Sequence, residues 1–187
     1  MDTLVWVDLE TEGLEPEQHQ ILEACFAVTD INLNLLVSYN APLRPYISPT
    51  KDRLSVITYE MHTKSGLLKD VAGASLQLHE YERNVVAMLK NFINQPIVLC
   101  GNSVWFDKSF IVRHMPTLAQ ALHYRVIDVS SFKEFVGQRY GIWNVNGNPP
   151  HRAYLDLMAS IEEMKTYVKL MEYGLQRVPG VYVGHQN

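Results

Sequence analysis

Short apolar runs separated by polar turns predict five β-strands in this chain of 187 residues. The expected strands are residues 4–9, 20–29, 33–41, 97–100 and 124–129. The turn around Asp30 and Asn32 is polar and short, which is typical of a hairpin between the second and third strands. The sheet is therefore expected to begin with antiparallel strands.

Apolar positions that recur every three or four residues predict helices in the remaining segments. Helices are expected near 54–60, from Ser75 to the break at Pro96, at 106–114, at 130–140 and in a long final segment from about Asp156. Two helices carry apolar stripes, formed by Leu78, Tyr81, Val85, Leu89 and Phe92 and by Leu157, Ile161, Met164, Val168, Met171 and Leu175. We expect both stripes in the core, and irregular structure over most of 42–75 and over 143–150.

The order of these elements predicts the fold class. Three strands followed by alternating helices and strands favour an α/β fold, with a mixed five-stranded sheet flanked by helices. Because 187 residues suit one domain with a substantial core, we expect residues 1–187 to form a single domain. Ligands of such sheets bind in crevices beyond the strand ends, particularly where the connection pattern changes.

The composition is that of an ordinary globular protein, with 47% hydrophobic and 19% charged residues. A strand follows Met1 and Asp2 directly, without a basic and apolar leader, and no apolar run approaches the roughly 20 residues that span a bilayer. We therefore expect a cytoplasmic protein with no membrane partner. Cys25 and Cys100 lie in apolar runs, which favours buried reduced thiols over a disulfide or a zinc site.

The net charge of −4 limits the nucleic acids that the chain is expected to bind. Affinity for long nucleic acids depends on Lys and Arg residues that neutralise many phosphates, and the sequence has no basic block. A long duplex is therefore an unfavourable partner. A short nucleotide held through metal ions is compatible with an acidic chain, because bound divalent cations supply positive charge.

Two carboxylates lie at the end of the first predicted strand, in the sequence LVWVDLETEG of residues 4–13. Asp8 and Glu10 are two positions apart, so their side chains share a strand face about 7 Å from each other. Two such groups repel each other, and burying them unpaired is costly. Either a solvated strand end or a bound cation would explain the pair.

Three further residues complete a candidate catalytic set. Asp107 and Asp156 each begin a predicted helix, where an acid also complements the helix dipole. His151 is five positions before Asp156 and would not share its helix face, which places the histidine on the preceding loop. Together with the strand pair, the acids offer four oxygen ligands for Mg²⁺ or Mn²⁺. Two such ions about 3.5–4 Å apart support phosphodiester hydrolysis, in which an imidazole is suited to accept a proton from water.

Four motifs resemble those of the oligoribonuclease family, which belongs to the histidine branch of the DEDD 3′→5′ exonucleases. The motifs are DLETEGL, GNSVWFD, HYRVIDVSSFKEF and HRAYLD, and they follow one another in the family's order and spacing. The match covers about residues 4–170, and residues 62–66 extend it into the loop-rich region. The resemblance implies a ribonuclease H-like fold and two divalent metal ions. It also implies that Asp8, Glu10, Asp107 and Asp156 are metal ligands and that His151 is the general base.

The resemblance also implies contacts to a substrate. Leu14 matches a leucine that wedges between the two bases of a dinucleotide, and His62 matches a histidine in the pocket for the 3′ nucleotide. The cap over the 5′ phosphate corresponds to Ser103, Arg125, Ser130 and Ser131 in this sequence. Ser130 is equally suited to cap a helix. Tyr124 matches a tyrosine supplied by a second subunit, which implies a homodimer in which Tyr124 and Arg125 reach the other subunit's active site.

Five positions depart from the family pattern, namely Glu12, Ile57, Trp105, Phe106 and Leu155. Glu12 stands where threonine is usual and adds a charge beside the predicted metal site. Ile57 stands where a base-stacking tryptophan is expected, unless Tyr59 takes its place. None of the departures removes a predicted metal ligand, so they bear on base stacking and substrate length more than on the reaction.

These observations predict a metal-dependent 3′→5′ exoribonuclease that releases 5′-mononucleotides from short RNA, mainly dinucleotides. One alternative is a related exonuclease that trims tRNA or single-stranded DNA or proofreads for a polymerase, although the net acidity argues against binding along several phosphates. A second alternative is a binding module that kept the fold and lost catalysis. The presence of all five candidate catalytic residues argues against the second alternative.

Overall fold

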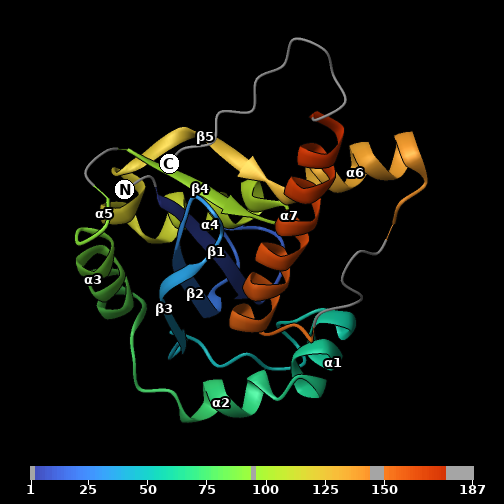
Figure 1. Cartoon of the computed structure of the whole chain (residues 1–187). Coiled ribbons are helices and arrows are strands. Elements are labelled where there is room, and N and C mark those ends of the chain that lie inside the picture. The colour runs from blue at the N-terminus through green and yellow to red at the C-terminus, as the bar shows by residue number, and fades with distance from the viewer. Residues whose placement is uncertain (1–2, 94–95, 144–149, 176–187) are drawn as a thin grey trace.

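A computed structural model describes residues 3–93, 96–143 and 150–175, and its centre is a mixed sheet of five strands (Figure 1). The strands are β1 (Thr3–Thr11), β2 (Ile21–Asp30), β3 (Leu35–Pro42), β4 (Ile97–Gly101) and β5 (Leu122–Asp128). Their order is β3-β2-β1-β4-β5, with antiparallel pairing among β1, β2 and β3 and parallel pairing of β4 with β1 and β5. The predicted fold class and the antiparallel start of the sheet are confirmed. Most of the predicted irregular segment 143–150 lies outside the described residues.

The helices cover both faces of this sheet. They are α1 (Val56–Lys64), α2 (Leu67–Gly73), α3 (Leu78–Leu89), α4 (Val104–His114), α5 (Pro116–Ala119), α6 (Val129–Tyr140) and α7 (Ala153–Leu175). In Figure 1 the long α7 crosses one face of the sheet, and its first turn lies near α1. Within the described part of the chain, none of the helices has the combination of length and apolar character that crossing a bilayer requires.

The alternation of side chains along β1 divides the core into two layers. Val5, Val7 and Leu9 pack in a cluster with residues of α3 and α4. Trp6 faces the opposite side, where it packs with residues of α6 and α7. Because Asp8 and Glu10 follow Trp6 at steps of two, both acids extend from the face that α7 covers. Cys25 and Cys100 are buried free thiols, as expected.

The two predicted apolar stripes differ in how completely they are buried. On α3, Leu78, Tyr81, Val85 and Leu89 are buried, and Phe92, just after the helix, is partly buried, so the core prediction is confirmed there. On α7 the prediction is confirmed for Leu157, Ile161 and Met164 and for the partly buried Val168. It is wrong for Met171, which is 42% exposed, because it lines an open groove between α6 and the last turns of α7. The side chain of Leu175, the last residue of this stripe, lies outside the described part of the structure.

Two helices are missing from the sequence-based expectations. The segment 42–75 contains α2 as well as a longer α1, because Leu67 and Val71 pack against Leu22 of β2. Gly66 turns the chain between α1 and α2 with a φ of 78°, which glycine adopts easily. Pro116 was expected to follow the end of a helix, and it also begins α5, where proline's missing N–H has no intrahelical partner to lose.

Two helix starts also differ from expectation. The helix expected from Ser75 begins at Leu78, because Gln77 and Glu80 form a capping box there. Ser130 is not the N-cap of α6, so that interpretation is wrong. Asp128 is the N-cap, and its side chain accepts a hydrogen bond of 3.0 Å from the Ser130 backbone N–H.

Candidate active site

The two acids of β1 are held in the protein interior. β1 pairs antiparallel with β2 on one side and parallel with β4 on the other, so the connection pattern changes at this strand. Glu10 is 6% exposed and Asp8 is partly buried, which makes the interpretation of a solvated strand end wrong. Burial raises the pKa of Asp8 well above its ordinary value, and the charge of Asp107 adds to this effect. Burial and the charge of Asp156 raise the pKa of Glu10 to about 8.

Asp107 reaches the same strand from α4. It lies in the first turn of α4 and is buried, and its Oδ1 accepts a hydrogen bond of 2.9 Å from the Leu9 backbone N–H. Gly101 allows β4 to approach β1 closely, since a Cβ there would lie 2.8 Å from the Val7 carbonyl oxygen. Burial raises the pKa of Asp107 to about 8, although the Leu9 N–H favours its ionised form. Asp107 is therefore fixed directly against the strand that carries the acid pair.

Asp156 and His151 enter the site from the start of α7. The ligand atoms of Glu10, His151 and Asp156 lie within 4.8 Å of one another. Asp156 Oδ1 is buried and has no hydrogen-bond partner among the described residues. Burial raises the pKa of Asp156, while backbone N–H groups and the nearby imidazole oppose that rise. His151 precedes the helix with a left-handed φ of 57°, as expected for a residue on the approaching loop.

This set of side chains fits a divalent cation. Carboxylate oxygens and an imidazole nitrogen converge, one buried carboxylate oxygen lacks a partner, and the raised pKa values reflect repulsion among the acids as well as burial. A bound divalent cation would remove that repulsion and supply the missing partner. The structure therefore brings together acids that lie far apart in the sequence.

A cleft of about 750 Å³ opens beside this acidic cluster. It is lined by Ile57, Met61, Lys64, Ser65, Pro150, His151, Arg152 and Leu155. Two of these lining residues, Ile57 and Leu155, are departures from the family pattern. Ile57 is 79% exposed. Tyr59 does not replace Ile57 there, because it lines a separate pocket on α1 with Lys51 Nζ 5.2 Å from its ring centre.

His62 lies beside the acidic cluster with its ring fully buried. Its Nε2 is 2.8 Å from the Thr11 carbonyl oxygen, so in the neutral ring Nε2 donates and Nδ1 is an acceptor. Nδ1 is 3.8 Å from Glu10 Oε2 and has no hydrogen-bond partner in the described parts of the chain. Burial lowers the pKa of His62, which favours this neutral form.

The sequence predicts that Glu12 adds a charge beside the metal site. In the structure Arg53 compensates this charge. The buried Glu12 carboxylate accepts a hydrogen bond of 2.9 Å from Arg53 Nη2. It also accepts bonds of 3.1 Å and 3.0 Å from the backbone N–H and side-chain amide of Gln20. Glu12 therefore joins the end of β1 to the loops that precede β2 and α1.

Two residues expected at the bases and at the second subunit, Leu14 and Tyr124, are exposed, unlike the buried His62. Leu14 is 75% exposed just beyond β1, and Tyr124 is 74% exposed on β5. The Arg125 guanidinium lies 5.3 Å from the centre of the Tyr124 ring. Trp105 is also exposed, whereas Phe106 packs against Phe110 with ring centres 5.0 Å apart. Phe106 therefore contributes to packing.

Two residues of the predicted phosphate cap, Ser103 and Ser130, are hydrogen-bonded to Asp128. One oxygen of this carboxylate, Oδ1, accepts hydrogen bonds from the Ser103 backbone N–H at 2.9 Å and from the Ser130 hydroxyl at 2.6 Å. Ser131 follows on α6 and is exposed. Asp128 thus brings Ser103 of the β4–α4 turn next to the start of α6.

Sequence reasoning missed four charged residues that organise the site, namely Asp128, Lys108, Glu23 and Arg152. Lys108 Nζ donates hydrogen bonds of 2.8 Å to the carbonyl oxygens of His123 and Tyr124, which fixes β5 to α4. Arg152 bonds to both carboxylate oxygens of Glu23. A signal for Glu23 was available, because a glutamate interrupts the apolar run ILEACFAV of β2.

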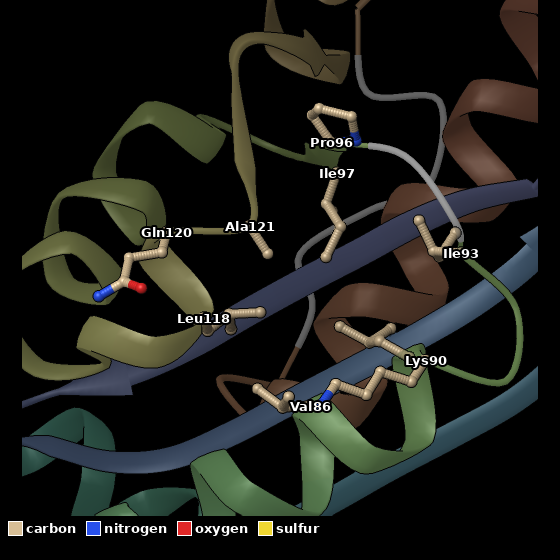
Figure 2. Close-up of a pocket in the computed structure, with 9 residues that line it drawn as sticks. Val86, Lys90, Ile93, Pro96, Ile97, Leu118, Gln120 and Ala121 are labelled. Atoms are coloured by element: carbon tan, nitrogen blue, oxygen red, sulfur yellow. The ribbon is translucent and has the colours of Figure 1, made fainter.

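The pocket shown in Figure 2 lies away from these groups. It has a volume of about 350 Å³ and is lined by Val86, Leu89, Lys90, Ile93, Pro96, Ile97, Leu118, Gln120 and Ala121. Ile97 begins β4, whereas Asp107 follows the opposite end of that strand. The pocket in Figure 2 is therefore separate from the acidic site.

Comparison with known proteins identifies the class and then the family. A sequence profile of the exonuclease family RNase_T matches residues 5–164. With the mixed sheet and the buried acids, this match defines the chain as an exonuclease of ribonuclease H-like fold. The oligoribonuclease of Corynebacterium diphtheriae is 38% identical over 174 residues, which cover 89% of this chain and 81% of the relative. The chain belongs to the oligoribonuclease family.

Solved structures with low sequence identity share the fold. Escherichia coli exonuclease I in complex with an oligonucleotide matches with a TM-score of 0.66 and 16% identity, over 92% of this chain and 42% of that protein. This chain therefore spans less than half the length of exonuclease I. Schizosaccharomyces pombe Pop2p, in a form with Mg²⁺ and Mn²⁺ bound, matches with a TM-score of 0.64 and 11% identity, over 87% and 81% of the two chains. The predicted ribonuclease H-like fold is confirmed.

Proposed function

We propose that this chain is a metal-dependent 3′→5′ exoribonuclease that degrades short oligoribonucleotides, mainly dinucleotides, to 5′-mononucleotides. The observation that carries the proposal is the convergence of Glu10, His151 and Asp156 within 4.8 Å, beside the buried Asp107 and the partly buried Asp8. Membership of the oligoribonuclease family supports both the reaction and the short RNA substrate.

The proposed cofactors are two divalent ions, Mg²⁺ or Mn²⁺, held by Asp8, Glu10, Asp107 and Asp156. When bound, such ions lower the pKa of a water molecule and stabilise developing negative charge on the leaving oxygen. The four carboxylates supply the hard oxygen ligands that these ions prefer. Glu10 is buried and Asp107 is hydrogen-bonded to the β1 backbone before substrate arrives, which reduces the reorganisation needed during the reaction.

His151 is the proposed general base. It accepts a proton from water as the water oxygen forms a bond to phosphorus. The bond between phosphorus and the 3′ oxygen of the preceding nucleotide breaks, and that oxygen takes up a proton from solvent and leaves as the 3′ hydroxyl of the shortened product. The terminal nucleotide then carries the phosphate on its 5′ oxygen, so the product is a 5′-mononucleotide. Because His151 adjoins the cleft of Ile57 and Leu155, this cleft is the proposed position of the 3′ nucleotide.

Length selection is assigned to the phosphate cap of Ser103, Arg125, Ser130 and Ser131. A guanidinium and hydroxyl groups are suitable donors for a terminal 5′ phosphate. The Ser130 hydroxyl donates to Asp128 in this structure, so it must rotate before it can donate to a phosphate. A longer strand would place a further nucleotide where the terminal phosphate is bound.

The test is cleavage of a 5′-phosphorylated dinucleotide and a 5′-phosphorylated heptamer by the same protein with Mn²⁺. We expect the dinucleotide to be cleaved at least about tenfold faster, since one lost charge-assisted contact of about 1.4 kcal/mol changes affinity tenfold. Equal rates would refute length selection and leave the nuclease assignment intact. Activity on long single strands that falls steeply with salt would favour the tRNA- or DNA-trimming alternative.

We also propose that the protein acts as a homodimer in which Tyr124 and Arg125 of one subunit complete the other subunit's active site. The exposure of Tyr124, with the Arg125 guanidinium 5.3 Å from its ring centre, supports this, because both side chains are accessible to a second subunit. The apolar groove of α6 and α7, which includes Phe135, Tyr140 and Met171, offers further surface for an interface.

Subunit mixing tests the shared site. Tyr124→Ala and Asp107→Asn proteins are each expected to have little activity alone. After unfolding and refolding together in equal amounts, half of the dimers are mixed and one of their two sites is intact, so about a quarter of parent activity returns. A mixture no more active than its components would contradict the shared site.

A further inference from the structure

We infer that Glu23 and Arg152 form an ion pair that positions His151 and Asp156 for the reaction. The inference rests on the proposed function, which gives His151 the role of general base and Asp156 that of a metal ligand. Arg152 lies between these two residues in the sequence, directly after His151 and at the approach to α7. Its contacts therefore determine where this segment meets the sheet.

Arg152 connects three parts of the fold. Its Nε donates to Glu23 Oε2 at 3.1 Å, and its Nη2 donates to Glu23 Oε1 at 3.0 Å, so β2 is bound in a bidentate manner. Nη2 also lies 2.8 Å from Asp70 Oδ2 on α2. Nη1 donates to the Ser65 carbonyl oxygen at 3.4 Å, between α1 and α2. One guanidinium thus holds the His151 segment to the sheet and to the helices beside the cleft.

Glu23 also binds the backbone at the start of α7. Its Oε2 accepts a hydrogen bond of 2.9 Å from the Ala153 N–H, which is one of the helix N–H groups that have no partner within the helix. The carboxylate is 1% exposed. Glu23 therefore fixes both the side chain before α7 and the first turn that carries Asp156.

Glu23 acts through these contacts rather than as a fifth metal ligand. It is directly opposite Glu10 in the β1–β2 pairing, so the two carboxylates are close neighbours. Both of its oxygens are already used, since Oε1 accepts from Arg152 and Asn40 and Oε2 accepts from Arg152 and Ala153. Replacing Arg152 would leave the buried Glu23 carboxylate without its cation, and replacing Glu23 would leave Arg152 paired with Asp70 alone, so either change loosens the segment.

The experiment compares Glu23→Gln, Arg152→Lys and Arg152→Ala with a matched control, Glu82→Gln. Glu82 is another buried glutamate that binds helix N–H groups, accepting bonds of 2.7 Å and 2.9 Å from Thr117 and Leu118 at the start of α5. It lies on α3 and is among neither the acidic cluster nor the cleft residues. Glu23→Gln preserves the Arg152 charge, so its effect reports the ion pair and not the loss of a cation near Glu10.

We expect Glu23→Gln to lower kcat on a dinucleotide by roughly 10- to 100-fold with KM nearly unchanged, as for other residues that orient ligands. Arg152→Lys should recover part of the activity lost in Arg152→Ala, because the lysine retains one charged contact. Glu82→Gln should keep the parent kcat even if its Tm falls equally. Backbone hydrogen exchange of residues 151–157 should accelerate in Glu23→Gln and not in Glu82→Gln, with or without metal.

Several outcomes would overturn the inference. These are a parent-like kcat in Glu23→Gln, an equal loss of kcat in Glu82→Gln, a change confined to KM, or unchanged exchange of residues 151–157. If Glu23→Gln does not fold, the comparison of Arg152→Lys with Arg152→Ala decides in the same way. If the unmodified protein does not cleave RNA, the proposed function fails, and the exchange measurement alone decides whether the ion pair holds this segment.

Discussion

The acidic site and the surface expected to bind substrate are built in opposite ways. Asp107 is buried and bonded to the β1 backbone, and Glu10 is almost inaccessible. Leu14, Ile57 and Tyr124 project into solvent. Glu10 and Asp107 are therefore held in place by the fold, whereas Leu14, Ile57 and Tyr124 are left to be covered by substrate and, as we propose, by a second subunit. Changes to the first region should affect kcat, and changes to the second should affect KM.

The largest effect is expected from Asp107→Asn. The substitution keeps the size of the side chain and removes a proposed metal ligand, so kcat on a dinucleotide with Mn²⁺ should fall roughly 10³-fold or more. Glu162→Gln is a suitable control, because Glu162 is an exposed acid that pairs with Lys165 on α7. A fall of less than tenfold in Asp107→Asn would remove this residue from the proposed site.

His151→Ala should have the next largest effect. Loss of a general base commonly costs about 10²-fold in rate, and the four acids would still hold the metal ions. The stabilisation of the folded protein by Mn²⁺, measured as a rise in Tm, should therefore be retained while kcat falls. An unchanged kcat would assign proton transfer to another group.

Leu14→Ala should have a smaller effect that is confined to substrate binding. Contacts between a base and a side chain contribute about 1–2 kcal/mol, so KM for a dinucleotide should rise about 5- to 30-fold with kcat nearly constant. Ile31→Ala is the matched control, since Ile31 is also exposed but lies in the turn between β2 and β3. If both variants kept the parent KM, the wedge role of Leu14 would be wrong.

The smallest effect concerns stability and pH. Burial raises the pKa of Glu10 from 4.5 to about 8, and raises that of Asp107 to about 8. Between pH 4.5 and about pH 8 the buried carboxyl group of Glu10 stays protonated in the folded state but has lost its proton in the unfolded state. The free energy of unfolding of the metal-free protein therefore decreases as pH rises through this range. Its Tm should fall by at least about 5 °C between pH 5 and pH 8, and Mn²⁺ should restore more of the Tm at pH 8 than at pH 5. A Tm of the metal-free protein that rises from pH 5 to pH 8 would contradict the raised pKa values of Glu10 and Asp107.

The sequence predicted the sheet because hydrophobic periodicity is a local property. The same reasoning placed Asp8 and Glu10 on one strand face, and the resemblance to a family grouped them with Asp107, Asp156 and His151. Local hydrophobic periodicity did not predict α2, because this helix is stabilised by the contact of Leu67 and Val71 with Leu22. It also placed Met171 in the core, because a periodic stripe does not show where the covering sheet ends.

The charged contacts around the site were not predictable, because their partners are distant in the chain. Glu23 and Arg152 are separated by 129 positions, and Glu12 and Arg53 by 41. A charge within an apolar strand indicates that some partner exists, but only the packing of α7 on β2 shows which one. Glu12 illustrates the consequence, since its expected charge beside the acids is compensated by Arg53.

The most direct test is a crystal structure with Mn²⁺ and a dinucleotide monophosphate, in which anomalous scattering locates the manganese. The account predicts two manganese ions bound by Asp8, Glu10, Asp107 and Asp156, with His151 directed at the scissile phosphate. Manganese bound elsewhere, in crystals of protein that cleaves the dinucleotide in solution, would contradict it.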